Sequence, residues 1–90
     1  MSFVEWAKNS LDFLDKLDKK DSERIVKKIN EIKGNPLRFI RGLINKDFGK
    51  IKIGDYRLFV DFIIKEDRLI IRSIKHRRNA YKNILKTEND

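Results

Sequence analysis

Apolar residues in the first half of the chain recur at the spacing of an α-helix. Two groups repeat every three to four residues, as on one side of a helix: Leu11, Phe13, Leu14 and Leu17, then Ile25, Val26, Ile29 and Ile32. A few polar residues separate the groups, and two helices joined in this way form an antiparallel hairpin. The spacing therefore predicts two antiparallel helices over residues 10–33.

Capping residues mark where these helices are expected to begin and end. Ser10 is suited to cap the first helix, and Asp21 or Ser22 the second, because their side-chain oxygens accept hydrogen bonds from free backbone N–H groups. The tripeptide Gly34-Asn35-Pro36 is expected to end the second helix. Glycine accepts a left-handed cap there, and proline cannot continue a helix.

The period changes near residue 46 to that of β-strands. Lys50-Ile51-Lys52-Ile53 alternates strictly between polar and apolar positions, and two β-rich runs follow. Three strands in an antiparallel meander are predicted, at residues 49–53, 56–64 and 69–75. Elsewhere we expect an edge strand or a helical turn at 3–6, a loop or broken helical turn at 37–48, and a short C-terminal helix at 77–86.

These elements predict the fold class α+β. Two helices form a hairpin that packs on a small antiparallel β-sheet, and a short C-terminal helix follows. Ninety residues leave no room for a second hydrophobic core, so a single domain over residues 1–90 is expected.

The turn at Gly54-Asp55 sets which side chains share a face of the sheet. A two-residue turn pairs Lys52 with Arg57, and opposed residues project to the same face. One face is then apolar and suited to the helical hairpin, with Ile51, Ile53, Tyr56, Leu58, Val60 and Phe62. Lys50, Lys52 and Arg57 share the other face, which Arg72 and His76 are expected to join if a four-residue loop connects the last two strands.

The second face is expected to bind a partner. Lys52 and Arg57 lie directly opposite each other, and opposed like charges cost stability unless an anion lies between them. The same face is expected to carry four apolar residues beside the cations, which is typical of an interaction surface: Phe59, Ile63, Ile70 and Ile74.

The charge balance strengthens this expectation. Twenty-two Lys and Arg residues against fourteen Asp and Glu residues give a formal net charge of +8. Residues 72–86 hold six basic residues and His76 but no acidic residue. A local cationic excess attracts polyanions, so we expect a nucleic acid or an acidic protein as partner.

Other compositional features exclude several classes of protein. The chain has no cysteine and one histidine, which argues against disulfides, thiolate metal sites and zinc enzymes, and no cofactor is expected. Charged residues in the first dozen positions do not fit a signal peptide, and no apolar run approaches a membrane span. We therefore expect a cytoplasmic protein with no membrane partner.

Two strings of residues resemble the RelE/ParE toxin superfamily. Residues 49–58, GKIKIGDYRL, resemble its central hairpin, in which a basic strand, a tight turn and a Tyr-Arg-hydrophobic run follow one another. Residues 74–81, IKHRRNAY, are similar to its closing motif, and the helical hairpin followed by Asn-Pro also fits. The resemblance covers nearly the whole chain. Neither string is specific alone, but the order and spacing of these features together are.

For a RelE-type member, the resemblance implies cleavage of messenger RNA in the ribosomal A site. The 2′-hydroxyl would attack the neighbouring phosphate without a metal, leaving a 2′,3′-cyclic phosphate and a free 5′-hydroxyl. The positions matching the family's catalytic set are Lys50, Lys52, Arg57, Arg77 and Tyr81, where the match at Tyr81 assumes a small gap. Further RNA contacts are expected from Arg72, Lys75, His76, Arg78 and Lys82.

The resemblance also implies a protein partner and leaves alternatives open. In this superfamily an acidic, partly disordered antitoxin, here RelB-like, wraps the toxin. ParE-type members share the fold but act on DNA gyrase and generally lack the cationic and tyrosine set. A further alternative is an inactive relic of such a toxin, folded and still bound by an antitoxin. Outside the superfamily, the chain could be a basic module that binds nucleic acid without cutting it.

Overall fold

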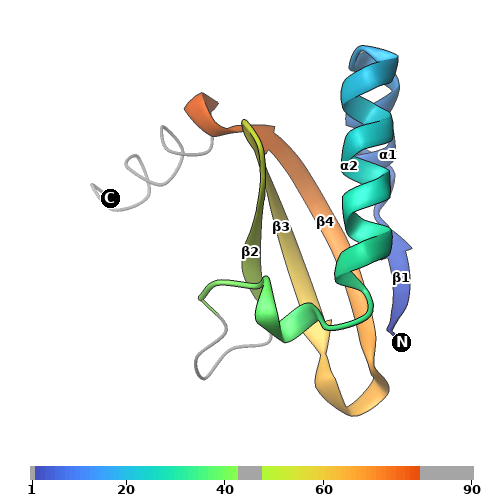
Figure 1. Cartoon of the computed structure of the whole chain (residues 1–90), viewed down its shortest axis with the longest axis vertical. Coiled ribbons are helices and arrows are strands. Elements are labelled where there is room, and N and C mark those ends of the chain that lie inside the picture. The colour runs from blue at the N-terminus through green and yellow to red at the C-terminus, as the bar shows by residue number, and fades with distance from the viewer. Residues whose placement is uncertain (1, 43–47, 80–90) are drawn as a thin grey trace.

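A computed structural model describes residues 2–42 and 48–79 of the chain. The described elements are β1 (Phe3–Trp6), α1 (Lys8–Lys16), α2 (Lys19–Ile32), the 3₁₀ turn η1 (Pro36–Arg38), β2 (Phe48–Ile53), β3 (Tyr56–Ile63), the 3₁₀ turn η2 (Ile64–Glu66) and β4 (Arg68–His76). The strands form one sheet in the order β1-β4-β3-β2, and α1 and α2 form a hairpin on one side of it (Figure 1). The α+β class and the helical hairpin are confirmed.

The sheet is mixed, because β1 lies parallel to β4 whereas the other neighbours are antiparallel. Residues 3–6 are therefore an edge strand. Beyond β4, residues 77–79 form a helical turn, and the rest of the predicted C-terminal helix lies outside the described residues. No helix in the described part of the chain is long and apolar enough to cross a membrane.

Both helices begin earlier than the capping residues predicted. Helix α1 starts at Lys8 and α2 at Lys19, and neither has a side-chain cap. Ser10 is instead buried inside α1, where its hydroxyl donates to the Ile71 carbonyl of β4 at 2.9 Å. The Ser22 hydroxyl donates to the Leu14 carbonyl of α1 at 2.6 Å. The cap predictions are wrong because these hydroxyls join elements rather than terminate helices.

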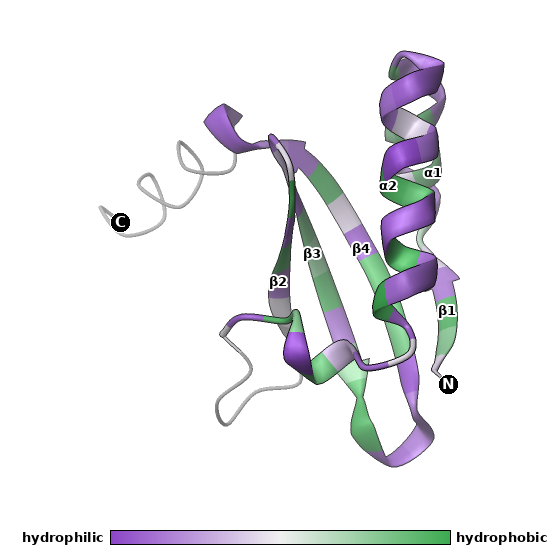
Figure 2. Ribbon diagram, in the orientation of Figure 1, coloured by the Kyte–Doolittle hydropathy of each residue, from purple (hydrophilic) through white to green (hydrophobic). Residues whose placement is uncertain are grey.

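The core fills the space between the helical hairpin and one face of the sheet. Of the six residues predicted for the helix-facing side of the sheet, five are buried and the sixth, Tyr56, is half-buried. Figure 2 shows the corresponding apolar stretches along β2, β3 and β4. Ile25, Ile29 and Ile32 of α2 are completely buried against them, whereas Leu11 and Val26 are exposed despite their helical spacing.

The β2–β3 hairpin has the predicted register, with Lys52 opposite Arg57. Gly54 begins its turn at φ 57°, a left-handed conformation that glycine adopts without steric cost. An added Cβ would also lie 2.6 Å from Nη2 of Arg24 on α2, so a side chain at position 54 would make this flexible guanidinium move. The turn is thus in direct contact with the helical hairpin.

A β-bulge changes the predicted register between β3 and β4. Val60 pairs with Ile71 but Phe59 pairs with Ser73, which leaves Arg72 as an extra residue. Beyond the bulge Arg57 faces Lys75, and His76 faces Tyr56 on the helix side. The predicted placement of His76 and Ile74 on the outer face is therefore wrong. A shift of two residues preserves side-chain faces, but a one-residue bulge exchanges them.

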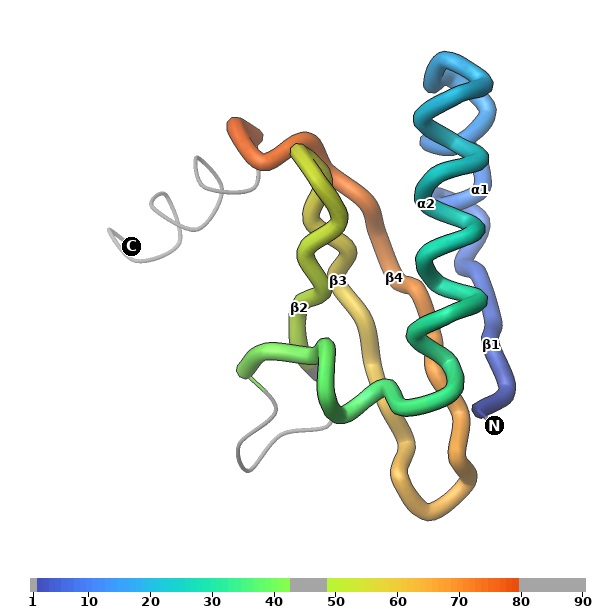
Figure 3. The backbone as a smooth tube through the Cα atoms, in the orientation of Figure 1, coloured from blue at the N-terminus to red at the C-terminus, as the bar shows by residue number. Residues whose placement is uncertain are grey.

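After α2 the chain runs across to the edge of the sheet that β2 forms, which is the edge opposite β1 (Figure 3). Arg41 then pairs with Lys50 through two backbone hydrogen bonds of 2.9 Å. These bonds cover part of the edge of β2 and fix the backbone at Lys50.

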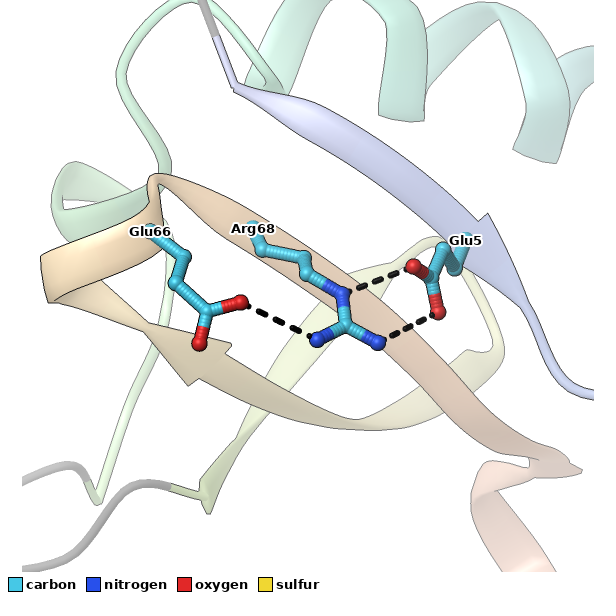
Figure 4. A network of polar contacts seen from close by, with 3 residues as sticks. All are labelled: Glu5, Glu66 and Arg68. Carbon is cyan, nitrogen blue, oxygen red and sulfur yellow. Dashed lines mark hydrogen bonds and ion pairs between the residues drawn. The ribbon is translucent and has the colours of Figure 1, made fainter.

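The strand β1 is clamped to β4 by an ion-pair network (Figure 4). Arg68 donates from Nε and Nη2 to the two carboxylate oxygens of Glu5, at 2.7 and 3.1 Å, and from Nη1 to Glu66 at 3.2 Å. The hydrogen bond from Arg68 lowers the pKa of Glu5, and the same bond raises the pKa of Arg68. This network lies at the end of the sheet far from the Gly54-Asp55 turn.

Candidate active site

Two lysines of β2 and one arginine of β3 lie together on the face of the sheet that the helices leave uncovered. Lys52 is exposed and lies directly across from Arg57, while Lys50 is half-buried one pair further along, opposite Phe59. Neither lysine is buried against the helical hairpin. The prediction that these three cations share the outer face is therefore confirmed.

Arg57 is held rigidly although it carries a charge. Only 4 % of its surface is exposed, and its Nη1 donates to the carbonyl oxygens of Gly54 and Tyr56, each at 3.0 Å. A buried charge is costly unless hydrogen bonds compensate it. These bonds attach the guanidinium to the β2–β3 turn and fix its position beside Lys52.

Arg77 reaches the same turn from the end of β4. Its backbone N–H donates to the Asp55 carbonyl at 2.6 Å, and its side chain is exposed. The β-bulge adds Lys75 to this side, opposite Arg57. We call the resulting set the turn cluster, which comprises Lys50, Lys52, Arg57, Lys75 and Arg77.

His76 does not join the turn cluster. Its ring stacks edge-on against Tyr56, with centroids 5.7 Å apart, and Tyr56 also stacks on Phe13 of α1 at 6.1 Å. Its Nδ1 accepts a hydrogen bond from the backbone N–H of Arg78 at 3.3 Å. His76 thus helps to order the backbone on both sides of Arg77.

The tyrosine between these rings is anchored to the second helix. The Tyr56 hydroxyl donates to Oδ2 of Asp21 at 3.1 Å. Burial raises the pKa of Tyr56, and the hydrogen bond to Asp21 raises it further. Neutral and half-buried, this tyrosine connects α1, α2, β3 and the end of β4 behind the turn cluster.

The remaining predicted residues are distributed differently. Arg72 is exposed on the outer face, but its Nη1 forms an ion pair of 2.8 Å with Asp61, so its charge is compensated. Arg78 is exposed in the helical turn after β4. Tyr81 and Lys82 lie outside the described residues.

One cation near the turn was missed by sequence reasoning. The guanidinium of Arg24 lies over Gly54, whose carbonyl oxygen accepts a hydrogen bond from Arg57. Basic residues on a helix surface are typical of ordinary solvated faces, so the periodicity of α2 gave no signal for this contact.

Comparison with known proteins identifies the family of this chain. A family model described as the ParE toxin of type II toxin–antitoxin systems, parDE, matches residues 4–81. The chain belongs to this toxin family. It is thus a toxin of a toxin–antitoxin system, within the RelE/ParE superfamily suggested by its hairpin and closing strings. A comparison with curated proteins found no match.

Solved structures show that the fold of this toxin is RelE-like. The toxin in the intact E. coli RelBE toxin–antitoxin complex is 25% identical, with 84% of this chain and 96% of that chain covered and a TM-score of 0.68. The isolated E. coli RelE toxin is 24% identical, with 97% and 98% covered and the same TM-score. The archaeal RelE-RelB complex from Pyrococcus horikoshii OT3 gives 21% identity, 84% and 94% coverage, and a TM-score of 0.69.

The turn cluster of this toxin is suited to phosphate chemistry. Cations fixed before the reaction stabilise charge that develops in a transition state, and this is commonly the largest catalytic contribution. Arg57 is held by the turn carbonyls, and the backbone of Arg77 is tied to Asp55. Lys50, Lys52, Lys75 and Arg77 are at least partly exposed beside the buried Arg57, so the arrangement is suited to binding a phosphodiester.

Proposed function

We propose that this toxin is a ribosome-dependent endoribonuclease that cleaves messenger RNA and so arrests translation. The observation that carries the proposal is the turn cluster, in which β2, β3 and the end of β4 each place cations at one end of the outer face. The residue-by-residue resemblance to RelE-type toxins supports the choice of messenger RNA as substrate.

The reaction would proceed by attack of the RNA's own 2′-hydroxyl. The 2′-oxygen forms a bond to phosphorus as its proton is removed, the bond from phosphorus to the 5′-oxygen breaks, and that oxygen takes up a proton. Lys50 and Lys52 promote the attack, Arg57 holds the phosphate, and Arg77 assists the leaving 5′-oxygen. Tyr81 supplies a stacking platform or accepts a proton. No metal or other cofactor takes part in this scheme.

The ribosome is required because the described site lacks a conventional acid–base pair aimed at the substrate. His76, the chain's one histidine, is turned toward Tyr56 on the helix side of the sheet. Positioning of the reacting groups must then supply much of the rate acceleration, and such positioning is worth about 7–11 kcal/mol in favourable cases. A message held in the ribosomal A site would meet this requirement.

The remaining cations in and beside the turn cluster would bind the RNA without taking part in the chemistry. Lys75, opposite Arg57, and the exposed Arg78 are the best placed of those described. Lys82 belongs to this group on the sequence pattern. Arg72 contributes less in this scheme, because Asp61 already compensates its charge.

An acidic, RelB-like antitoxin is the proposed protein partner, and the cytoplasm the proposed place of action. Solved RelE structures include toxin–antitoxin complexes from E. coli and Pyrococcus horikoshii. On this toxin, half-buried Phe59, Ile63 and Ile70 lie on the outer face beside the cations. A partner with apolar side chains and acidic groups would complement that surface.

Inhibition of DNA gyrase is the second candidate function. It is favoured by the family model, whose description names the ParE toxin. The matched catalytic positions argue against it, because ParE-type members generally lack this cationic and tyrosine set: Lys50, Lys52, Arg57, Arg77 and Tyr81. The two activities are readily separated, since a gyrase inhibitor leaves messages intact.

The decisive test is to add the purified toxin to messenger RNA with and without translating ribosomes. Primer extension should show cuts within the coding region only when ribosomes are present. A parallel supercoiling assay with DNA gyrase should show no inhibition. Intact message together with blocked supercoiling would establish the second candidate instead, and cutting of bare RNA would remove the ribosome from the proposal.

A further inference from the structure

A second cationic site lies around the edge of the sheet from the turn cluster. It is a hollow of about 380 Å³ between helix α2 and the end of β2. Its lining includes Arg24, Lys27, Lys28 and Glu31 of α2, and Lys52 and Gly54 of the β2–β3 hairpin. We call this hollow the α2 groove.

The α2 groove is strongly positive. Four basic residues and one acidic residue line it, and the acidic residue, Glu31, is already engaged by Lys28 at 3.7 Å. Within residues 2–42 and 48–79, Arg24, Lys27 and Lys52 form no ion pair. Clustered cations of this kind repel one another and favour the binding of an anion.

The spacing of these cations suits an extended anion rather than a single small one. Residues three and four apart on a helix are neighbours, about 5–6 Å apart at Cβ, so Arg24 neighbours both Lys27 and Lys28 on α2, and Lys52 adds a cation from β2. Lys52 belongs to both the α2 groove and the turn cluster. Gly54 also connects the two sites, because Arg24 lies over it and Arg57 holds its carbonyl oxygen.

We propose that the α2 groove binds the phosphodiester backbone of RNA, next to the phosphate held by the turn cluster. The identity of the polyanion rests on the proposed function, whereas the presence of an anion site rests on the groove itself. On the ribosome the toxin would meet two such RNAs, the message that is cut and the ribosomal RNA around it. Both present the same backbone chemistry.

The lining favours RNA over an acidic protein segment. Protein partners bury apolar side chains at the centre of an interface. Ile53 is the one apolar side chain among the residues that line the α2 groove, and it is 4 % exposed. A protein segment would find more apolar surface on the outer sheet face, at Phe59, Ile63 and Ile70.

The test compares two double variants that remove the same charge. Arg24→Ala/Lys27→Ala changes the α2 groove, and Lys8→Ala/Lys16→Ala removes two exposed cations from α1, which lines no part of it. Affinity is measured over a range of salt concentrations for a short single-stranded RNA with 2′-O-methyl riboses, which cannot be cleaved, and for programmed ribosomes. Poly-glutamate serves as the acidic-polypeptide probe.

The groove variant should bind RNA roughly tenfold more weakly near physiological salt. For the single-stranded probe, the log–log slope of affinity against salt concentration should fall by about 0.7 per cation removed. The control variant has lost the same two charges but keeps the groove, so it should bind the same probes nearly as tightly as wild type. Weaker binding to the free strand would identify the message as the occupant, and weaker binding to ribosomes alone would identify ribosomal RNA. A charge-preserving variant, Arg24→Lys/Lys27→Arg, should retain affinity and shows that the loss is not one of folding.

Equal RNA affinity and salt slope for the groove and control variants would overturn the proposal. Loss of poly-glutamate binding with RNA binding intact would also overturn it, in favour of an acidic protein. The outcome is separate from that for the proposed function. If wild type cuts no message but the groove variant still loses RNA affinity, the RNA site remains and the nuclease assignment fails.

Discussion

The two ends of the outer sheet face differ in whether their basic residues have acidic partners. At the end near η2, each arginine has an acidic partner: Arg68 binds Glu5 and Glu66, and Arg72 binds Asp61. At the end near the Gly54-Asp55 turn, Lys50, Lys52 and Lys75 form no ion pair within the described ranges. Cations paired with carboxylates hold strands together. Crowded cations without such partners are typical of a surface that binds an anion.

Removal of one uncompensated cation should have the largest effect on activity. Lys52→Ala should reduce cleavage of a translated message by about 10²–10³, the usual cost of losing one electrostatic stabiliser. Folding should be nearly unaffected, because Lys52 is exposed. Single-turnover rates on programmed ribosomes measure the loss, with Lys19→Ala as control, since Lys19 is an exposed residue of α2 outside both sites. A Lys52→Ala rate equal to the control's would exclude Lys52 from the chemistry.

The turn that carries the cluster should be the next most sensitive point. Gly54→Ala should destabilise the fold by about 1–2 kcal/mol, because a left-handed φ is costly for alanine. It should also displace the Arg24 guanidinium, which lies where the Cβ would be. Gly34→Ala is the matched control, since a Cβ there meets its nearest atom at an ordinary 3.5 Å. Urea unfolding of both variants measures the difference, and equal stabilities would contradict the account of the turn.

Much of the fold could be predicted because it follows from periodicity. Helical spacing placed Ile25, Ile29 and Ile32 in the core, and the Gly54-Asp55 turn fixed the β2–β3 register. The two opposed cations Lys52 and Arg57 then followed from the pairing rule alone. Local patterns determine such features, so one sequence is sufficient to find them.

What could not be predicted depends on contacts between distant segments. The one-residue bulge at Arg72 moved His76 to the helix side and Lys75 to the outer face, and no local pattern marks a bulge. Arg24 reaches the site only through the packing of α2 on the hairpin. Ser10 and Ser22 resembled caps because their hydrogen-bond partners cannot be seen in the sequence. Ser10 bonds to β4, and Ser22 bonds to α1.

The contacts behind the turn cluster should have a smaller effect. Tyr56→Phe keeps the stacking on Phe13 and His76 but removes the hydrogen bond to Asp21, which should cost roughly 1 kcal/mol of stability. Cleavage should fall much less than in Lys52→Ala, because Tyr56 lies on the helix side of the sheet. Thermal unfolding and cleavage rates of the same preparation provide the measurement. A loss of activity as large as that of Lys52→Ala would move Tyr56 into the chemistry.

The compensated end should show the smallest effect, and one that depends on pH. The pKa of Glu5 is lowered from 4.5 in the folded protein, so its ion pair contributes stability above the unfolded value and loses it as the pH falls through the folded value. Glu5→Gln should therefore lower Tm slightly at neutral pH, and the difference from wild type should vanish in acid. Glu23→Gln, whose pair with Lys19 is exposed and 3.9 Å long, should change Tm less at either pH. A Tm difference for Glu5→Gln that persists unchanged in acid would contradict this assignment.

The contrast between the two ends is tested most directly by removing one arginine from each and measuring cleavage and Tm together. Arg77→Ala, at the turn cluster, should lose about 10²–10³ in cleavage of a translated message with little change in Tm. Arg68→Ala, at the compensated end, should lower Tm and cut the message as wild type does. Primer extension and thermal unfolding on the same samples give both values. Normal cleavage by Arg77→Ala, or a loss of cleavage by a folded Arg68→Ala, would contradict the account.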